Sequence, residues 1–120
     1  MSVPRTFNSE TERHTLIVRP LRSIGSLAEE NVKPELDSIL KQVQDLDLKN
    51  AVIDLAEIPY FGTSMLEAMY TIWRHVRDKE GKMAVCNASK MGREILRVSR
   101  FDTLWPVYAT RDEALDALGQ

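Results

Sequence analysis

The sequence predicts an α/β domain with a mixed sheet of four to five strands and about four helices. Short β-branched and apolar runs alternate with segments whose apolar residues recur at helical spacing. Glycine and proline are spread between these segments, and there is no repeat or Gly/Ser linker. The 120 residues suit one domain. We therefore expect a single domain over residues 1–120, with an N-terminal edge strand and turn at 1–13 and the core at 14–118.

The first elements precede a helix whose start is ambiguous. Residues 3–7 predict a short edge strand, residues 8–13 a polar turn, and residues 14–20 a strand. The helix can begin at Asn31, with Pro34 in its first turn, or at Ser26, where residues 26–29 form a capping-box pattern. Its expected buried positions are Leu36, Ile39, Leu40, Val43 and Leu46.

The central strand and helix give the strongest pattern in the chain. Residues 51–55 are apolar except for Asp54, which predicts a strand covered on both faces, and residues 58–62 form its exit loop. The apolar side chains of the following helix lie within an arc of roughly 160°. They are Met65, Leu66, Met69, Tyr70, Ile72, Trp73 and Val76. Gly81 is expected to end this helix as a left-handed cap.

Alternating strands and helices complete the chain. Residues 82–87 predict a strand, residues 89–100 a helix with Met91, Ile95 and Val98 facing inward, and residues 104–108 a last short strand. Thr110 should cap a final helix that buries Ala114, Leu115 and Leu118. Because strands alternate with helices, right-handed crossovers should join a largely parallel or mixed sheet.

Composition argues against several classes of function. Sixteen basic residues against eighteen acidic ones leave a net charge of −2, which disfavours binding to nucleic acid or to an anionic membrane. No apolar run approaches the length of a membrane span and no signal peptide is evident, so a cytoplasmic protein is expected. One cysteine and two scattered histidines predict neither a disulfide nor a metal cluster. We expect no cofactor and no enzyme activity.

The loop at residues 60–64 is the first candidate site. It follows the carboxyl end of a buried strand, where ligands and partners of open α/β sheets bind. It also opens the strongest helix, whose N-terminus favours a negative group. Ser64 fits a capping box with Glu67 and is expected to cap the helix. Thr63 is not needed for that box and could serve either structure or function.

Other polar residues carry weaker signals. Lys90, Arg93, Arg97 and Arg100 are spaced to line one side of the third helix, which indicates a solvated face and leaves room for an acidic partner. Cys86 lies in an apolar strand and should be a buried, inert thiol. Asp54 could bond the following loop or mark the strand end.

Residues 52–66 resemble the pattern of the STAS domain, the fold of bacterial anti-sigma factor antagonists and stressosome proteins. The pattern is an apolar strand, Asp54-Leu55, a short loop, and then a stretch that matches the family's Asp-Ser/Thr-Ser-Gly-Leu at Gly62-Thr63-Ser64-Met65-Leu66. Residues 81–83 and 101–108 add to the resemblance, which covers about 14–118.

The resemblance implies a regulatory module that binds an anti-sigma factor with kinase activity. The kinase would phosphorylate the first hydroxyl of the stretch, Thr63, with Ser64 as second choice, and a phosphatase would restore binding. The implied partner contacts are Phe61, Gly62, Thr63, Met65 and Leu66. Gly62 replaces the family's Asp and Met65 its Gly, so that Met65 should add a bulky side chain to the contact surface.

Two other functions remain open at this point. The domain could be a constitutive scaffold or a transporter-associated subunit that is never phosphorylated, which the two departures favour. It could also sense a nucleotide in a pocket beside the same loop. A homodimer or a larger hetero-assembly is compatible with any of these functions.

Overall fold

The computed structural model describes residues 5–119 and contains one five-stranded sheet. The strands are β1 (Phe7–Glu12), β2 (Thr15–Pro20), β3 (Asn50–Asp54), β4 (Met83–Cys86) and β5 (Val107–Tyr108). They lie in the order β1-β2-β3-β4-β5. The β1–β2 pair is antiparallel, and the other three pairs are parallel. The predicted mixed α/β fold is therefore confirmed.

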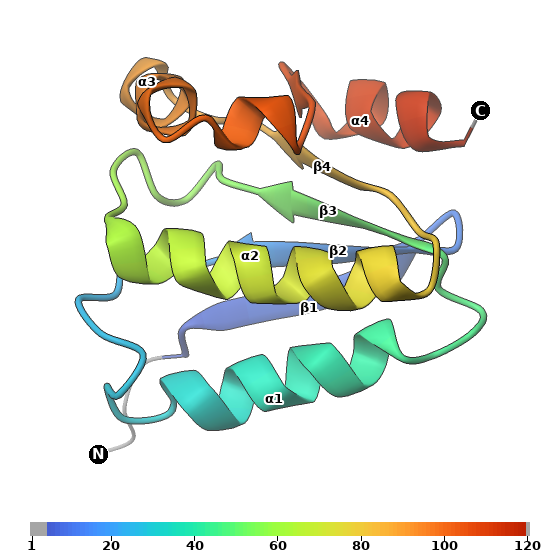
Figure 1. Ribbon diagram of the computed structural model, residues 1–120, viewed down its shortest axis with the longest axis horizontal. Coiled ribbons are helices and arrows are strands. Elements are labelled where there is room, and N and C mark those ends of the chain that lie inside the picture. The colour runs from blue at the N-terminus through green and yellow to red at the C-terminus, as the bar shows by residue number, and fades with distance from the viewer. Residues whose placement is uncertain (1–4, 120) are drawn as a thin grey trace.

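Helices cover both faces of this sheet. They are α1 (Val32–Val43), α2 (Thr63–Asp78), α3 (Lys90–Val98), the short 3-10 helix η1 (Phe101–Thr103) and α4 (Arg111–Leu118). Figure 1 shows α1 and α2 running side by side, with α3 and α4 at the other end of the strand order. Successive side chains along each strand point to opposite faces of the sheet. Val18, Ile53 and Val85 join the core under α1 and α2, whereas Ile17, Val52 and Ala84 pack against α4.

The predicted polar turn at residues 8–13 is wrong, because these residues form most of β1. Glu12 pairs with Thr15, so the hairpin turns at Arg13 and His14, whose φ angles are 52° and 59°. Two positive φ values are typical of the two-residue turns that match strand twist. An edge strand tolerates polar side chains where its face meets solvent. The strand expected at 3–7 falls partly outside the described residues, and only Phe7 belongs to β1.

The first helix begins after Asn31, and Pro34 lies in its first turn. At the competing start, the Glu29 carboxylate accepts the N–H of Ser26 at 3.0 Å, but the chain forms only a turn there. Leu46 is 91% exposed, so its predicted burial is wrong. The helix ends at Val43, and Leu46 therefore lies beyond the helical face that packs on the core.

Gly81 is not the predicted left-handed cap. Glu80 takes the left-handed conformation instead, with φ 63°. A Cβ on Gly81 would collide with the carbonyl oxygen of Lys49. Glycine is needed at this position because the backbone of residue 49 approaches closely, not because of its own φ.

Helix α3 presents a different face to the core from the predicted one. Gly92 and Leu96 are buried, whereas Met91 and Val98 are 56% and 67% exposed and Ile95 is half-buried. A Cβ on Gly92 would lie 3.3 Å from the Phe61 ring, so the helix makes its close approach at this glycine. In α2, the expected apolar face is mostly buried, but Tyr70 remains 36% exposed.

Candidate functional site

Two apolar side chains anchor the loop between β3 and α2 in the core. Ile58 and Phe61 are 3% and 1% exposed and belong to the main core. The loop is also bonded to the start of α3, where the Ser89 hydroxyl donates to the Pro59 carbonyl at 2.7 Å. Ser89 also caps α3 by accepting from the N–H of Gly92. The start of α3 is therefore joined to the loop by a hydrogen bond.

Asp54 holds the carboxyl ends of the strands together and also bonds the loop. Its Oδ1 accepts from the N–H of Ala56 and from the Asn87 side-chain amide, both at 3.0 Å. Its Oδ2 accepts from Nε and Nη2 of Arg111 at 3.3 and 3.1 Å. Both structural roles predicted for Asp54 are present. Burial alone would lower the pKa of Arg111, but hydrogen bonds to Glu10 and Asp54 outweigh it and raise the pKa.

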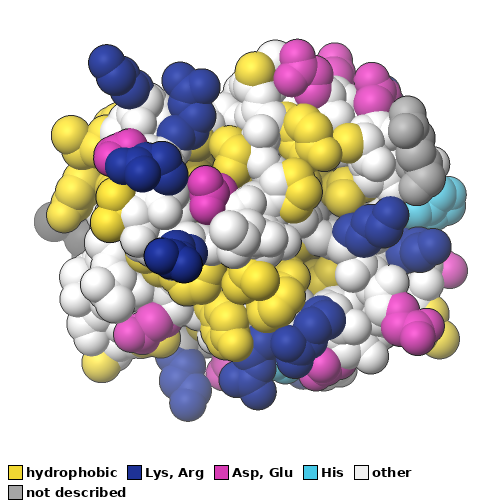
Figure 2. Space-filling model, turned by 45° about the horizontal axis from the view of Figure 1, so that its top comes forward, with side chains coloured by type: hydrophobic (Ala, Val, Ile, Leu, Met, Phe, Trp, Pro, Cys, Tyr) yellow, Lys and Arg dark blue, Asp and Glu magenta, His cyan; other side chains and the backbone are white. Residues whose placement is uncertain are grey.

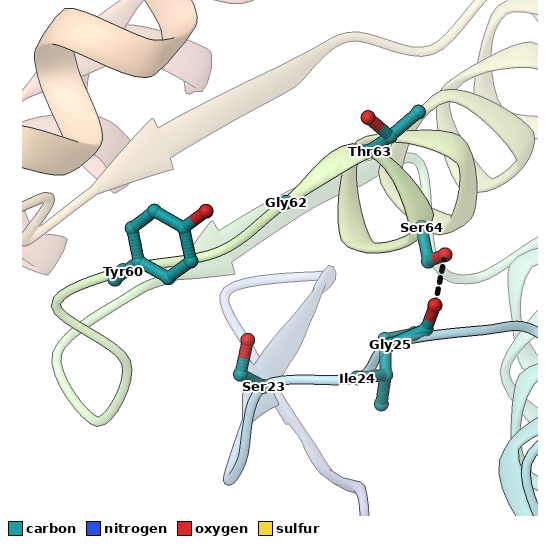
Figure 3. A pocket seen from close by; sticks show the side chains of 7 residues that line it. All are labelled: Ser23, Ile24, Gly25, Tyr60, Gly62, Thr63 and Ser64. Carbon is teal, nitrogen blue, oxygen red and sulfur yellow. Dashed lines mark hydrogen bonds between the residues drawn. The ribbon is translucent and has the colours of Figure 1, made fainter.

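The start of α2 has no side-chain cap, so the predicted capping role of Ser64 is wrong. Gly62 is the N-cap residue, and Ser64 lies two positions inside the helix. Its hydroxyl donates instead to the carbonyl of Gly25 at 3.2 Å, which ties α2 to the loop after β2 (Figure 3). The first helical bond runs from the N–H of Leu66 to the carbonyl of Gly62. The preceding three N–H groups have no acceptor within the helix, and no acidic residue lies in the first turn.

Thr63 is exposed at the first position of this helix, on the rim of two hollows. The first, about 390 Å³, lies between the loops after β2 and β3 (Figure 3). The second, about 550 Å³, lies beside α2, with Leu66 and Tyr70 on one side and Phe101 of η1 among its other lining residues. Within residues 5–119, the Thr63 hydroxyl has no hydrogen-bond partner, in contrast to the engaged hydroxyl of Ser64. In Figure 3 the Thr63 side chain points away from the Ser64–Gly25 bond.

Three of the five expected contact residues have buried side chains. Phe61 is 1%, Met65 0% and Leu66 8% exposed. Their apolar side chains face the core because they continue the buried stripe of α2 and anchor its entry loop. Only Gly62 and Thr63 offer accessible surface in this conformation, with Leu66 at the floor of the larger hollow. Met65 therefore adds no bulk to the contact surface, contrary to the expectation from its replacement of the family's Gly.

Several residues around Thr63 were not among the partner contacts expected from the sequence. Tyr60 is 59% exposed and lines the smaller hollow, while Glu67, Tyr70 and Phe101 line the larger one. Helical spacing could have identified Glu67 and Tyr70, which lie four and seven positions after Thr63. Phe101 could not be found in this way, because tertiary folding brings η1 to α2.

The remaining candidate groups serve structural roles or lie in solvent. Burial, together with the smaller effect of the Asp54 charge, raises the pKa of the Cys86 thiol to about 12. The prediction of a buried Cys86 is confirmed. The basic residues of α3 are exposed, and Arg97 pairs with Glu94 at 2.5 Å. Within the part of the chain that the structure describes, no metal-binding cluster occurs and no helix is long and apolar enough to cross a membrane.

Comparisons with known proteins agree with this architecture. The chain is 24% identical over 83 residues to BtrV of Bordetella bronchiseptica, which carries the name of an anti-sigma factor antagonist; the match covers 69% of this chain and 72% of that protein. A solved anti-sigma-factor antagonist (STAS) domain protein from Planctomyces limnophilus superposes with a TM-score of 0.81 at 24% identity, covering 97% and 99% of the two chains.

The antagonist SpoIIAA from Bacillus is also similar at 18% identity. Its unphosphorylated form superposes with a TM-score of 0.75, covering 94% of this chain and 96% of SpoIIAA. Its phosphorylated form superposes with a TM-score of 0.64, covering 92% and 97%. The model of the STAS domain matches residues 6–114 of this chain. With that match over most of its length and the same fold in solved relatives, the chain belongs to the STAS domain family.

Proposed function

We propose that this chain is an anti-sigma factor antagonist, a protein-binding regulator without enzyme activity, and that phosphorylation of Thr63 releases its partner. The partner is an anti-sigma factor that also acts as the kinase, and a phosphatase reverses the modification. The names of BtrV and SpoIIAA and the phosphorylated form of SpoIIAA support this function. The observation that carries the proposal is the exposed Thr63 hydroxyl at the N-terminus of α2, between two hollows.

A phosphate at Thr63 changes the surface without unfolding the helix. It adds a charge of about −1.5 to −2 at neutral pH. The free N–H groups of the first turn and the helix dipole stabilise that charge. Glu67 lies one turn along the same face and opposes it by a smaller amount. The stabilisation by the helix N-terminus is the larger effect, so the domain should keep its fold in both forms.

Partner release follows from the position of the phosphate beside the larger hollow. A partner side chain that enters this hollow meets Leu66, Tyr70 and Phe101. The phosphate occupies the rim and adds negative charge next to Glu67, which repels an acidic partner surface and would have to be desolvated against an apolar one. Ser64 is the weaker acceptor in this proposal, because its hydroxyl is bonded to Gly25.

The test uses the cognate anti-sigma factor with ATP, followed by phosphosite mapping by mass spectrometry. We expect the label on Thr63, its loss in Thr63→Ala, and its retention in Ser64→Ala. Calorimetry should give wild-type affinity for Thr63→Gln and strongly reduced affinity for Thr63→Glu, which separates charge from bulk. Absence of label from both hydroxyls, together with unchanged binding by Thr63→Glu, would overturn the switch.

A constitutive scaffold is the competing function, favoured by Gly62 where the family pattern has Asp. A Cβ on Gly62 meets nothing within 4 Å, so lack of space does not explain the missing acid. Light scattering discriminates between the two functions. A large assembly whose mass does not respond to kinase and ATP favours the scaffold, whereas a small species that binds the kinase favours the antagonist.

Nucleotide sensing receives less support from the smaller hollow. Its lining residues are Ser23, Ile24, Gly25, Tyr60, Gly62, Thr63 and Ser64, none of which is basic. A nucleotide's phosphates would therefore rely on backbone N–H groups and hydroxyls alone. Calorimetric titration with GTP and ATP tests this function, and we expect no heat of binding.

A further inference from the structure

The outward face of α3 carries an apolar strip that the rest of the described chain covers only in part. Met91 and Val98 are 56% and 67% exposed, and Ile95 between them is half-buried. At 100° per residue, the three side chains fall within an arc of about 60°, and they span about 10 Å of helix. Leu96 and Gly92 already attach α3 to the domain. Ile95 also packs partly against the core, whereas Met91 and Val98 leave most of their apolar surface exposed.

Basic side chains run alongside this apolar strip. Lys90, Arg93 and Arg97 occupy a neighbouring arc of about 60°, and Arg100 follows just after the helix. Residues 90–100 hold four cations and one carboxylate, a net charge of +3 on a chain whose net charge is −2. Glu94 between the two stripes pairs with Arg97. For the other three cations, no carboxylate of residues 5–119 lies within 4.0 Å.

We propose that this face of α3 binds an acidic amphipathic helix of a partner protein. The apolar strip has the i, i+4, i+7 spacing with which helices pack side by side. The unpaired cations beside it fit carboxylates on the flank of the incoming helix. Figure 2, in which the side of the molecule with α3 and α4 is turned forward, shows Lys and Arg side chains spread over the visible face with hydrophobic side chains among them. The combination selects a partner that is apolar and acidic on adjacent stripes.

A second copy of this chain fits the face poorly. Its most acidic helix is α4, with Asp112, Glu113 and Asp116. However, the apolar residues of α4, namely Ala114, Leu115 and Leu118, are buried against the sheet. Helix α4 thus offers charge without a matching apolar strip. An anionic membrane is also a poor fit, because three apolar side chains over two turns bury little area in lipid and Glu94 lies within the face.

This binding does not depend on Thr63 phosphorylation, although a hydrogen bond joins α3 to the loop that leads to Thr63. Ser89 caps α3 and holds the Pro59 carbonyl of the loop that leads to Thr63. A partner that contacts α3 therefore lies beside the loop that carries Thr63. The two surfaces can be tested separately, because Thr63→Glu should leave binding at α3 unchanged.

The probe is a fluorescein-labelled, stapled helical peptide of about 18 residues, with leucines at i, i+4, i+7 and i+11 and glutamates on one flank. The matched control peptide carries lysines in place of the glutamates. Fluorescence anisotropy should show roughly tenfold tighter binding of the acidic peptide, and this preference should shrink as salt rises from about 50 to about 300 mM. Nitrogen-15 NMR should place the shifted amides at residues 90–100.

Protein variants locate the contact. Val98→Ser should weaken acidic-peptide binding roughly fivefold, and Arg93→Glu should weaken it at least as much. Leu46→Ser is the control, because Leu46 is equally apolar and 91% exposed but lies beyond α1. It should change nothing, and circular dichroism checks that each variant is folded.

Four results would each overturn the proposal. The acidic and basic peptides bind alike, or the shifted amides lie outside residues 90–100. Wild type binds vesicles of anionic lipid in a Val98-dependent way, which assigns the face to a membrane. Light scattering detects self-association that Val98→Ser abolishes, which assigns the face to a second copy.

Discussion

Loss of the Arg111 guanidinium should destabilise the domain more than loss of any exposed ion pair. Arg111 donates two hydrogen bonds to Asp54, whose side chain is only 5% exposed, and Arg111 itself is 24% exposed. In Arg111→Met, the buried carboxylate keeps only the Ala56 N–H and the Asn87 amide. Breaking a buried pair costs about 3–5 kcal/mol. Because water reaches part of Arg111, we expect a loss of about 2–4 kcal/mol in the free energy of unfolding.

Urea denaturation of wild type and variants measures this loss through the midpoint at constant m-value. The Asp54→Asn and Arg111→Met double-mutant cycle should show coupling of at least about 1 kcal/mol, since the neutral amide introduced by Asp54→Asn no longer needs a cation. Arg13→Met is the matched control, because its ion pair with Asp116 is 53% and 67% exposed and should therefore contribute little to stability. The reasoning is refuted if Arg111→Met costs no more than Arg13→Met.

Three further outcomes follow from the same structure. Gly81→Ala should lower the free energy of unfolding by about 1–3 kcal/mol, because the new Cβ would collide with the Lys49 carbonyl oxygen; a loss below about 0.5 kcal/mol in thermal denaturation would contradict that close approach. Gly62→Asp should raise the free energy of unfolding by about 0.5–1 kcal/mol, because an aspartate at this position would cap the positive end of α2 and its Cβ would meet no other atom; an unchanged melting temperature would contradict this. With its pKa raised to about 12, Cys86 stays protonated and buried, so thiol reagents at neutral pH should label it only on unfolding, and rapid labelling of the native protein would refute this account. Because the pKa of Cys86 is higher in the folded state than in the unfolded state, its contribution to stability should persist below the unfolded pKa and disappear as pH rises toward 12.

Local sequence patterns correctly predicted the elements whose burial or capping depends on neighbouring residues of the chain. The strand at β3 is buried on both faces, and its continuous apolar run predicts that. Thr110 caps α4 by accepting from the N–H of Glu113 at 3.1 Å, as its position predicts. Strand β1 was missed because an edge strand with a solvent-facing side has the polar composition of a turn.

In the candidate site, too, the sequence predicted local features but not those that depend on tertiary contacts. Thr63 at a helix start after a buried strand is a local feature, and the sequence alone pointed to it. The burial of Phe61 and the use of the Ser64 hydroxyl by Gly25 depend on loops that meet only in the folded chain. A capping box predicts the local bond of Ser64, but the tertiary acceptor 39 positions away replaces it.

Periodicity and short-range turn chemistry were enough to predict most of the order of strands and helices, the largely parallel sheet and the loop that carries Thr63. The outward side of α3 and the need for glycine at position 81 follow instead from the way that distant segments pack. Met91, Ile95 and Val98 share a face as regular as any core stripe, but Leu96 joins the main core and Gly92 lies against the Phe61 ring. Periodicity shows that a helix has an apolar face, whereas the space left by neighbouring elements decides whether that face is buried.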